Sequence, residues 1–143
     1  MIENIHVKSR KDMVSCIKEL NKPSILISIR DVGAKMILDE NQNLFHRLHL
    51  EFEDWDKEAD GEIVISDIDA TMIARFVKTW NDSPAEYDLY VNCEAGQSRS
   101  AGVAAAIAKY LFDDDEIFFR IKHPNMLCYR KVLNALMEEN EDD

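Results

Sequence analysis

The sequence predicts an α/β protein, with a central, mostly parallel sheet of four to five strands flanked by helices in a single domain, residues 1–143. Two observations carry this prediction. Short apolar runs alternate with amphipathic stretches along the chain, the pattern of strands joined by helices. The chain also has the length of one domain and, at 46% hydrophobic residues with only 4 Gly and 3 Pro, enough apolar side chains for a core.

The first half of the chain supplies three predicted strands and one helix. Residues 5–7 form a short apolar run, and residues 11–20 carry apolar side chains at helical spacing before Pro23 stops the helix. Residues 24–30 (SILISIR) form a continuous branched apolar run, which is typical of a buried central strand. Residues 45–52 alternate apolar and polar side chains, which predicts a half-buried strand.

The longest predicted helix begins after Ser66. Ser66 and Asp69 approximate a capping box, in which each side chain bonds the other residue's backbone N–H group. An apolar stripe follows at helical spacing, made of Ile68, Met72, Ile73, Phe76, Val77 and Trp80.

The last part of the chain predicts a strand and three helices. The strand covers residues 87–91, and the helices cover residues 99–112, 115–121 and 125–138. Residues 137–143 form an acidic tail, which we expect to fray into solvent.

Charge and composition exclude several classes of function. The chain has 17 Lys and Arg against 28 Asp and Glu, a formal net charge of −11, which argues against general binding to nucleic acid or to acidic membranes. No apolar stretch approaches the roughly 20 residues that cross a bilayer, and the first residues lack the core of a signal peptide. We therefore expect a cytoplasmic protein whose three cysteines are reduced thiols, and any phosphate site in it must be local.

One segment carries chemistry. A predicted buried strand ends at Cys93, Arg99 follows after five residues, and a helix begins there. A turn that leads into a helix directs several backbone N–H groups into one concavity, where the helix dipole adds positive charge. Gly96 allows a close approach of backbone or ligand within this turn. The segment therefore predicts an anion site that favours the thiolate form of Cys93, while Arg99 grips two oxygens of a phosphoryl group.

The segment CEAGQSRS resembles the signature loop of the cysteine-dependent protein tyrosine phosphatase superfamily: Cys, five residues, Arg, then Ser or Thr. Gly96 and Ser100 match the pattern, and the late position of the loop is similar to that in small dual-specificity phosphatases of bacterial or phage type. The order of elements agrees over residues 24–137. Asn92 departs from the pattern, because the family usually has His before the cysteine.

The resemblance implies a metal-independent phosphomonoester hydrolase with no cofactor, working through a cysteinyl-phosphate intermediate. It implies that Cys93 is the nucleophile, that Arg99 binds the phosphoryl oxygens and that Ser100 hydrogen-bonds the departing thiolate. The implied phosphate-binding loop consists of Glu94, Ala95, Gly96, Gln97, Ser98 and Arg99. The substrate would be a phosphorylated protein or a small phosphomonoester.

The resemblance also implies a general acid on a loop after an earlier strand, and two residues compete for this role. Asp54 follows Leu48, Leu50 and Phe52 in phase, at the carboxyl end of the predicted third strand. Asp56 lies two residues further along the same acidic loop and is the alternative. The register favours Asp54.

Alternative interpretations remain for several features. A phosphate-binding or phosphoprotein-binding module with little turnover is compatible with Asn92, and a rhodanese-type sulfurtransferase also uses a loop cysteine. Asn125 is interpreted as a helix cap, with a role behind the signature loop as the alternative. Cys16 and Cys128 are interpreted as core residues. His46 and His49 are three residues apart on a strand, so their side chains point to opposite faces of the sheet. We therefore assign no metal site to them.

Overall fold

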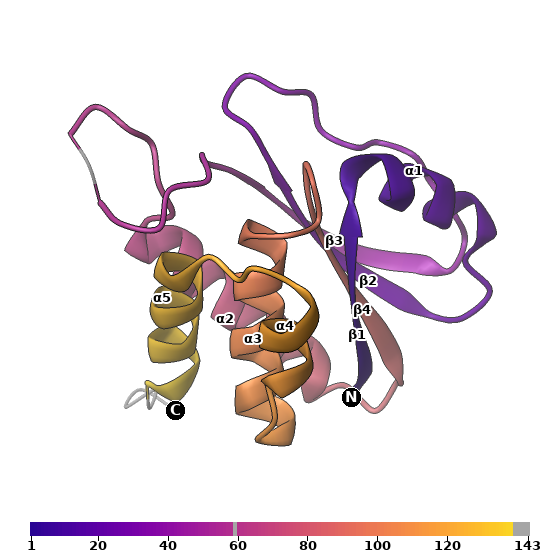
Figure 1. The fold of residues 1–143 in the computed structure, drawn as a ribbon. Helices are drawn as coiled ribbons and strands as arrows, with labels where there is room; N and C mark the ends of the chain where they lie inside the picture. The colour runs from indigo at the N-terminus through magenta and orange to yellow at the C-terminus, as the bar shows by residue number, and fades with distance from the viewer. Residues whose placement is uncertain (59, 139–143) are drawn as a thin grey trace.

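The computed structural model describes residues 1–58 and 60–138 and shows the predicted α/β architecture (Figure 1). Its elements are, in chain order, β1 (Ile2–Ser9), α1 (Arg10–Glu19), β2 (Ser24–Arg30), β3 (Leu44–Glu51), α2 (Asp67–Asn81), β4 (Tyr87–Cys93), α3 (Arg99–Phe112), α4 (Glu116–Ile121) and α5 (Met126–Met137). The four strands form one parallel sheet in the order β1-β4-β2-β3. Every predicted element is present, with ends shifted by a few residues.

The two inner strands are those with the most continuous apolar sequence. All residues of β2 except Arg30 are buried, and all residues of β4 except Tyr90 are buried. A parallel strand covered by helices on both faces needs apolar side chains at every position, which is why the run at residues 24–30 predicts a central strand. β1 and β3 lie at the two edges and carry more polar side chains.

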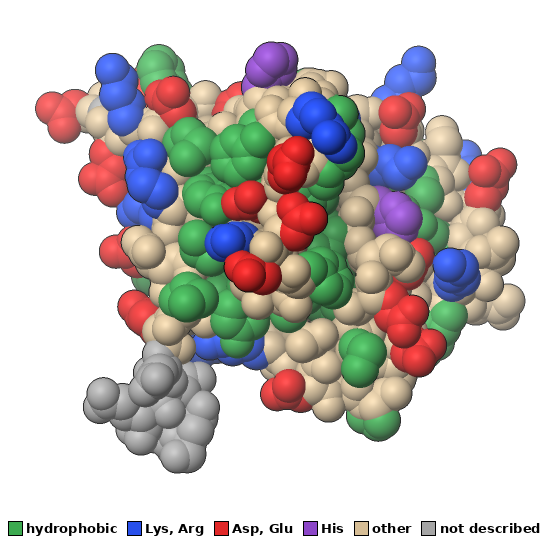
Figure 2. All heavy atoms as spheres, turned by 60° about the horizontal axis from the view of Figure 1, so that its bottom comes forward, with side chains coloured by type: hydrophobic (Ala, Val, Ile, Leu, Met, Phe, Trp, Pro, Cys, Tyr) green, Lys and Arg blue, Asp and Glu red, His purple; other side chains and the backbone are tan. Residues whose placement is uncertain are grey.

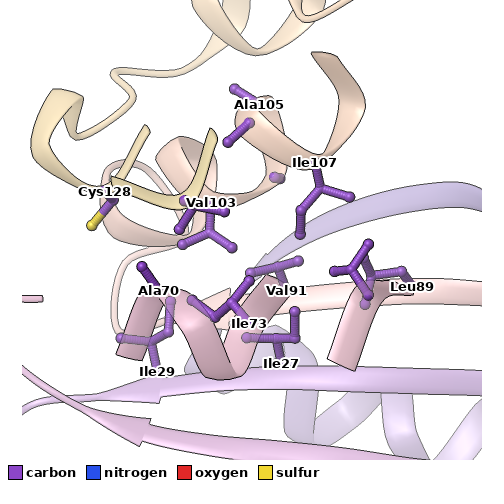
Figure 3. Close-up of a cluster of buried hydrophobic side chains, with 14 of the residues drawn as sticks. Ile27, Ile29, Ala70, Ile73, Leu89, Val91, Val103, Ala105, Ile107 and Cys128 are labelled. Carbon is purple, nitrogen blue, oxygen red and sulfur yellow. The ribbon is translucent and has the colours of Figure 1, made fainter. Parts of the chain in front are cut away.

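Helices cover the sheet unequally (Figure 1). α1 packs alone on one face, where Met13 and Ile17 meet Leu26 of β2 and Ile37 of the following loop. α2, α3 and α5 pack on the other face, and Figure 3 shows side chains of β2, β4 and these three helices meeting in one core. The labelled side chains of that core are Ile27, Ile29, Ala70, Ile73, Leu89, Val91, Val103, Ala105, Ile107 and Cys128.

α3 is the most enclosed helix, because it lies between the sheet and the other helices. Its first ten residues are all buried, and most of them are small. Gly102 shows how close the packing is, since a Cβ atom there would lie 2.4 Å from the backbone oxygen of Asn125. The small side chains of α3 therefore let the start of α5 approach the start of α3.

The predicted capping box at the start of α2 is confirmed, but its predicted apolar stripe is partly wrong. The Ser66 side chain accepts from the Asp69 N–H group, and the Asp69 carboxylate accepts from the Ser66 N–H group. Ile68 and Met72 are exposed, because the buried face of α2 is centred instead on Ala70, Ile73, Ala74 and Val77. Alanines at that face mark the side of closest packing, which a count of large apolar residues overlooks.

Two further predictions concern the C-terminal tail and membrane-spanning helices. Most of the predicted acidic tail, residues 139–143, lies outside the described residues. Among the helices of the described residues, none is long and apolar enough to cross a membrane.

Candidate active site

The signature loop lies at the carboxyl end of the sheet, between the end of β4 at Cys93 and the start of α3 at Arg99. In Figure 1 it is the orange loop above the sheet, beside the end of β1. In a parallel sheet flanked by helices, the crevice outside the carboxyl ends of the strands is the usual ligand site. The fold thus places the loop where a ligand can reach it.

The thiol of Cys93 is buried and lies within hydrogen-bond distance of the Ser100 hydroxyl. Cys93 is 2% exposed, Ser100 is fully buried, and the distance between Sγ and Oγ is 3.0 Å. Because Ser100 belongs to the first turn of α3, its hydroxyl can donate to a thiolate at Cys93 while the helix dipole favours the negative charge. This arrangement suits a sulfur that gains and loses charge during a reaction.

Gly96 is required by the contact between the loop and the start of α1. Its φ is +69°, in the left-handed region, and an added Cβ atom would lie 2.5 Å from the Ser9 nitrogen and 2.6 Å from the Lys8 carbonyl carbon. The neighbouring Arg10 N–H donates to the carbonyl oxygen of Glu94 at 3.0 Å. The backbone of the β1–α1 junction therefore holds the loop from outside.

The guanidinium of Arg99 is oriented by two acceptors. Arg99 is 5% exposed; its Nη1 donates to the Phe52 carbonyl oxygen at 2.8 Å and forms an ion pair with the Asp31 carboxylate, also at 2.8 Å. Its Nε is buried and has no hydrogen-bond partner within the described part of the chain. A buried donor without a partner is costly, so this N–H group provides a place for an acceptor such as a phosphoryl oxygen.

Asp31 was not identified from the sequence as a site residue. A signal for it existed, because Asp31 directly follows the buried strand β2, whose carboxyl end opens on the same edge of the sheet as Cys93. The loop after β2 contains several polar residues, and the sequence does not show which of them will lie next to Arg99. In the structure Asp31 forms an ion pair with Arg99.

Asp54, and not Asp56, contacts the signature loop. The Oδ1 atom of Asp54 accepts from the Ser98 hydroxyl at 2.8 Å and from the Asn125 side-chain amide at 2.8 Å. Asp56 is exposed, and no hydrogen bond or ion pair found among residues 1–58 and 60–138 involves its side chain. The structure therefore brings Asp54 to the signature loop, and its role as the general acid stays a prediction.

Asn125 combines the two roles that its sequence position left open. Its Oδ1 accepts from the Cys128 N–H group and caps α5, while its Nδ2 donates to Asp54 and to the Trp55 carbonyl oxygen. Its backbone N–H donates to the Ser98 carbonyl oxygen at 2.9 Å. Asn125 therefore caps a helix and also contacts both loops of the site.

Asn92 occupies the position at which the resemblance expects His. It is 1% exposed, and its Nδ2 lies 3.4 Å from the carbonyl oxygen of Cys93, a long hydrogen bond. Its Oδ1 has no partner among the described residues. The amide therefore keeps a donor toward the Cys93 backbone, but a weak one.

The other two cysteines are packing residues, Cys128 behind the site and Cys16 on the opposite face of the sheet. Cys128 is buried in α5, and burial, with a further contribution from the nearby Asp54 carboxylate, raises the pKa of its thiol far above the usual range. Cys128 therefore stays a neutral packing residue. Cys16 packs with the smaller cluster under α1, on the opposite face of the sheet.

The two strand histidines contribute nothing to the site. The ring of His46 stacks on the indole of Trp80, with centroids 3.5 Å apart. Burial, and the nearby Arg47 and Arg30, lower the pKa of His49. In the described part of the chain, no group of three or more His, Cys, Asp or Glu side chains could hold a metal ion.

Comparison with solved structures identifies the fold. A human tyrosine phosphatase-like serine/threonine/tyrosine-interacting protein matches with a TM-score of 0.62 at 18% identity, over 92% of this chain and 89% of that chain. The Yvh1 phosphatase domain from Chaetomium thermophilum matches with a TM-score of 0.52 at 18% identity, over 91% and 87%. OH1 from the Orf virus, described as a tyrosine phosphatase with triple substrate specificity, matches with a TM-score of 0.51 at 12% identity, over 93% and 80%.

These similarities define a class. The chain has the fold of tyrosine and dual-specificity phosphatase domains, over nearly its whole length. No protein-family model matches the sequence, and no curated protein sequence matches it. Identities of 12–18% show a shared fold alone, and the function of this chain depends on the residues of its site.

Proposed function

We propose that this protein is a metal-independent cysteine phosphatase that hydrolyses phosphomonoesters of the tyrosine or dual-specificity type. One observation carries the proposal: a single loop brings together the Cys93 thiol, the Ser100 hydroxyl and a buried Arg99 whose Nε lacks a partner among the described residues. The Asp54 carboxylate is attached to the same loop through Ser98. Nucleophile, oxygen-binding group and proton donor thus lie around one site, as this chemistry requires.

In the first step, the Cys93 thiolate attacks phosphorus. A sulfur–phosphorus bond forms and the bond from phosphorus to the ester oxygen breaks, while Arg99 and the loop backbone hold the other phosphoryl oxygens. Asp54 gives its proton to the leaving oxygen, which departs as an alcohol or phenol. The products of this step are the dephosphorylated molecule and a phosphorylated Cys93.

In the second step, water attacks the phosphorylated Cys93. Asp54, now a carboxylate, takes a proton from the water, and the sulfur–phosphorus bond breaks to release inorganic phosphate. The Ser100 hydroxyl, 3.0 Å from the sulfur, donates a hydrogen bond to the departing thiolate. The protein returns to its starting state without a metal ion or an external oxidant.

The substrate class follows from the same site. We propose a phosphorylated protein or a small phosphomonoester as substrate, since the loop residues would contact the phosphoryl group and Asp54 would contact the leaving oxygen. OH1 from the Orf virus, which shares the fold, displays triple substrate specificity, and this supports including more than one kind of phosphomonoester in the proposal. The cytoplasmic location and the bacterial or phage type suggested by the sequence stay predictions.

A second candidate function is phosphoprotein binding with little turnover. Asn92 favours it, because its long hydrogen bond to Cys93 orders the loop less firmly. Exposed large apolar side chains also gather from the end of α3 to the start of α5: Tyr110, Phe112, Ile117, Phe119, Ile121 and Met126. The face turned forward in Figure 2 shows hydrophobic side chains grouped beside acidic ones, as at a protein-binding surface.

Hydrolysis of p-nitrophenyl phosphate in the presence of a chelator tests the proposal. We expect turnover that survives the chelator and disappears in Cys93→Ser. A parent protein that binds inorganic phosphate but releases no p-nitrophenol would establish the binding module instead. Turnover that the chelator abolishes would contradict the cysteine mechanism.

A further inference from the structure

We infer that Ser98 and Asn125 are positioning residues that fix the Asp54 carboxylate, with Oδ1 held by both donors and Oδ2 left to carry the proton. The two donors lie on different elements, since Ser98 belongs to the signature loop and Asn125 precedes α5. Each lies 2.8 Å from the same oxygen of Asp54. The inference rests on the proposed function for its catalytic consequence, but the contact itself can be tested separately.

The orientation of the Asn125 amide is determined by its capping bond. Its Oδ1 accepts from the Cys128 N–H group at 2.9 Å, so this end of the amide must be the oxygen. The NH₂ end therefore faces Asp54 and the Trp55 carbonyl oxygen, with one N–H group for each. Because Asn125 is 3% exposed, water cannot readily replace these partners.

Hydrogen bonds also fix the backbone of Ser98. The Ser98 carbonyl oxygen accepts from the N–H groups of Gly102 at 2.8 Å and of Asn125 at 2.9 Å. Gly102 permits the approach, because any side chain there would collide with the backbone of Asn125. The close contact between α3 and α5 thus places both donors around one carboxylate oxygen.

The consequence for the reaction is twofold. Two hydrogen bonds to Oδ1 stabilise the carboxylate that forms as the proton leaves, and they leave Oδ2 as the oxygen that serves the leaving group. Ser98 directly precedes Arg99. The donor that holds Asp54 and the side chain proposed to hold the phosphoryl oxygens therefore lie on one rigid segment. Proton delivery should therefore depend on Asn125, although its side chain hydrogen-bonds Asp54, Trp55 and Cys128 and neither Cys93 nor Arg99.

Asn125→Asp separates positioning from helix capping. An aspartate oxygen still accepts from the Cys128 N–H group, but the donor toward Asp54 is replaced by a second carboxylate. Asn134→Asp, at an exposed position of α5, adds the same charge away from the site and serves as the matched control. The titratable groups near Asp54 are unchanged in both variants: Cys128 of α5, on whose thiol Asp54 acts, and Glu53 and Asp56 of its own loop.

The kinetic test compares a poor and a good leaving group. We expect Asn125→Asp to lose at least about 10-fold more kcat on phenyl phosphate than on p-nitrophenyl phosphate, because only the poor leaving group depends strongly on its proton. Ser98→Ala should show the same difference between the two esters more weakly. Ser98→Thr keeps a hydroxyl donor and should restore the parent kcat on both esters. The basic limb of the pH profile should move to higher pH in Asn125→Asp, since a second carboxylate makes it harder for Asp54 to lose its proton. Equal losses on both esters, or an unmoved basic limb, would overturn the inference.

A second measurement judges the contact without any activity. The ¹³C resonance of the Asp54 carboxyl carbon, followed against pH, should show a higher midpoint in Asn125→Asp than in the parent and in Asn134→Asp. An unchanged midpoint would show that Asn125 does not act on Asp54. If the parent hydrolyses neither ester, the proposed function fails while this titration still decides the positioning role.

Discussion

The two loops that face each other across the site are built in different ways. The residues at the two ends of the signature loop, Cys93, Arg99 and Ser100, are buried, and the backbone of the β1–α1 junction holds the loop through Gly96 and Glu94. Residues 53–58 of the acid loop are almost all exposed and form no helix or strand. The proposed phosphate-binding half of the site is thus anchored in the core at both ends of its loop, whereas the proposed proton-delivering half lies on an exposed loop.

The acid loop depends on a few side-chain contacts. Asp54 is held by Ser98 and Asn125, and further along the loop Glu58 pairs with Lys131 of α5 at 3.0 Å. Each of these contacts joins residues far apart in the sequence. The comparison teaches that the proposed binding half has its main residues in one short segment, which distant backbone then holds, whereas the proposed proton-delivering half depends on residues that are far apart in sequence. Four predictions test this division.

The largest expected effect is on the nucleophile. Cys93→Ser should lower hydrolysis of p-nitrophenyl phosphate by more than about 1000-fold, a loss of about 4 kcal/mol of barrier lowering. Inorganic phosphate should still bind, because the loop backbone and Arg99 remain. Cys16→Ser, on the opposite face of the sheet, is the control and should keep full activity. Turnover in Cys93→Ser above this limit would remove Cys93 from the mechanism.

The next effect is on Arg99. Arg99→Lys should lower kcat by about 100-fold to 1000-fold and weaken phosphate binding, because an ammonium cannot bond Phe52, Asp31 and a phosphoryl group in one plane. Asp31→Asn should act in the same direction but more weakly, since it loosens the guanidinium without removing it. Steady-state kinetics and phosphate titration measure both. Parent-like constants in Arg99→Lys would contradict the role.

A smaller and more selective effect belongs to the acid loop. Asp54→Asn should lower kcat on phenyl phosphate by at least about 100-fold and flatten the basic limb of the pH profile, with a weaker effect on p-nitrophenyl phosphate. Asp56→Asn is the matched control, two residues away on the same exposed loop. If Asp56→Asn shows the selective loss and Asp54→Asn does not, the contact with Ser98 has been misinterpreted, although the phosphatase proposal stands.

The smallest effect compares a glycine from each loop. Gly96 and Gly61 both have positive φ, so alanine strains the backbone at either position. At Gly61 the new Cβ atom meets nothing within 4 Å, whereas at Gly96 it collides with the backbone of Lys8 and Ser9. Gly96→Ala should therefore lower the free energy of unfolding by about 1–3 kcal/mol more than Gly61→Ala, as measured by urea unfolding. Equal losses would show that the loop is not held as tightly as this contact requires.

The same division explains what could be predicted from sequence. The run at residues 24–30, the Ser66–Asp69 capping box and the helix starting at Arg99 all depend on neighbours in sequence, and the structure contains each of them. Likewise, the motif from Cys93 to Ser100 places its own members in one loop. Local chemistry is sufficient for such features.

The features that sequence could not supply depend on distant packing. Asp31 reaches Arg99 and Asn125 reaches Asp54 only because the loops after β2 and before α5 meet at one edge of the sheet. Ile68 and Met72 are expected in the core but are exposed. The buried face of α2 includes Ala70 and Ala74, where neighbouring elements pack closely. Side-chain type alone does not show which of several polar or apolar residues will face the site or the core.

Trapping the covalent intermediate tests the central claim most directly. The parent protein is mixed with p-nitrophenyl phosphate, quenched in acid during the first turnovers, digested and analysed by mass spectrometry. The proposed mechanism predicts that the peptide containing Cys93 carries one added phosphoryl group, and that Asp54→Asn, with its second step slowed, accumulates more of it. Steady turnover with Cys93 unmodified throughout, or with the phosphoryl group on another residue, would contradict it.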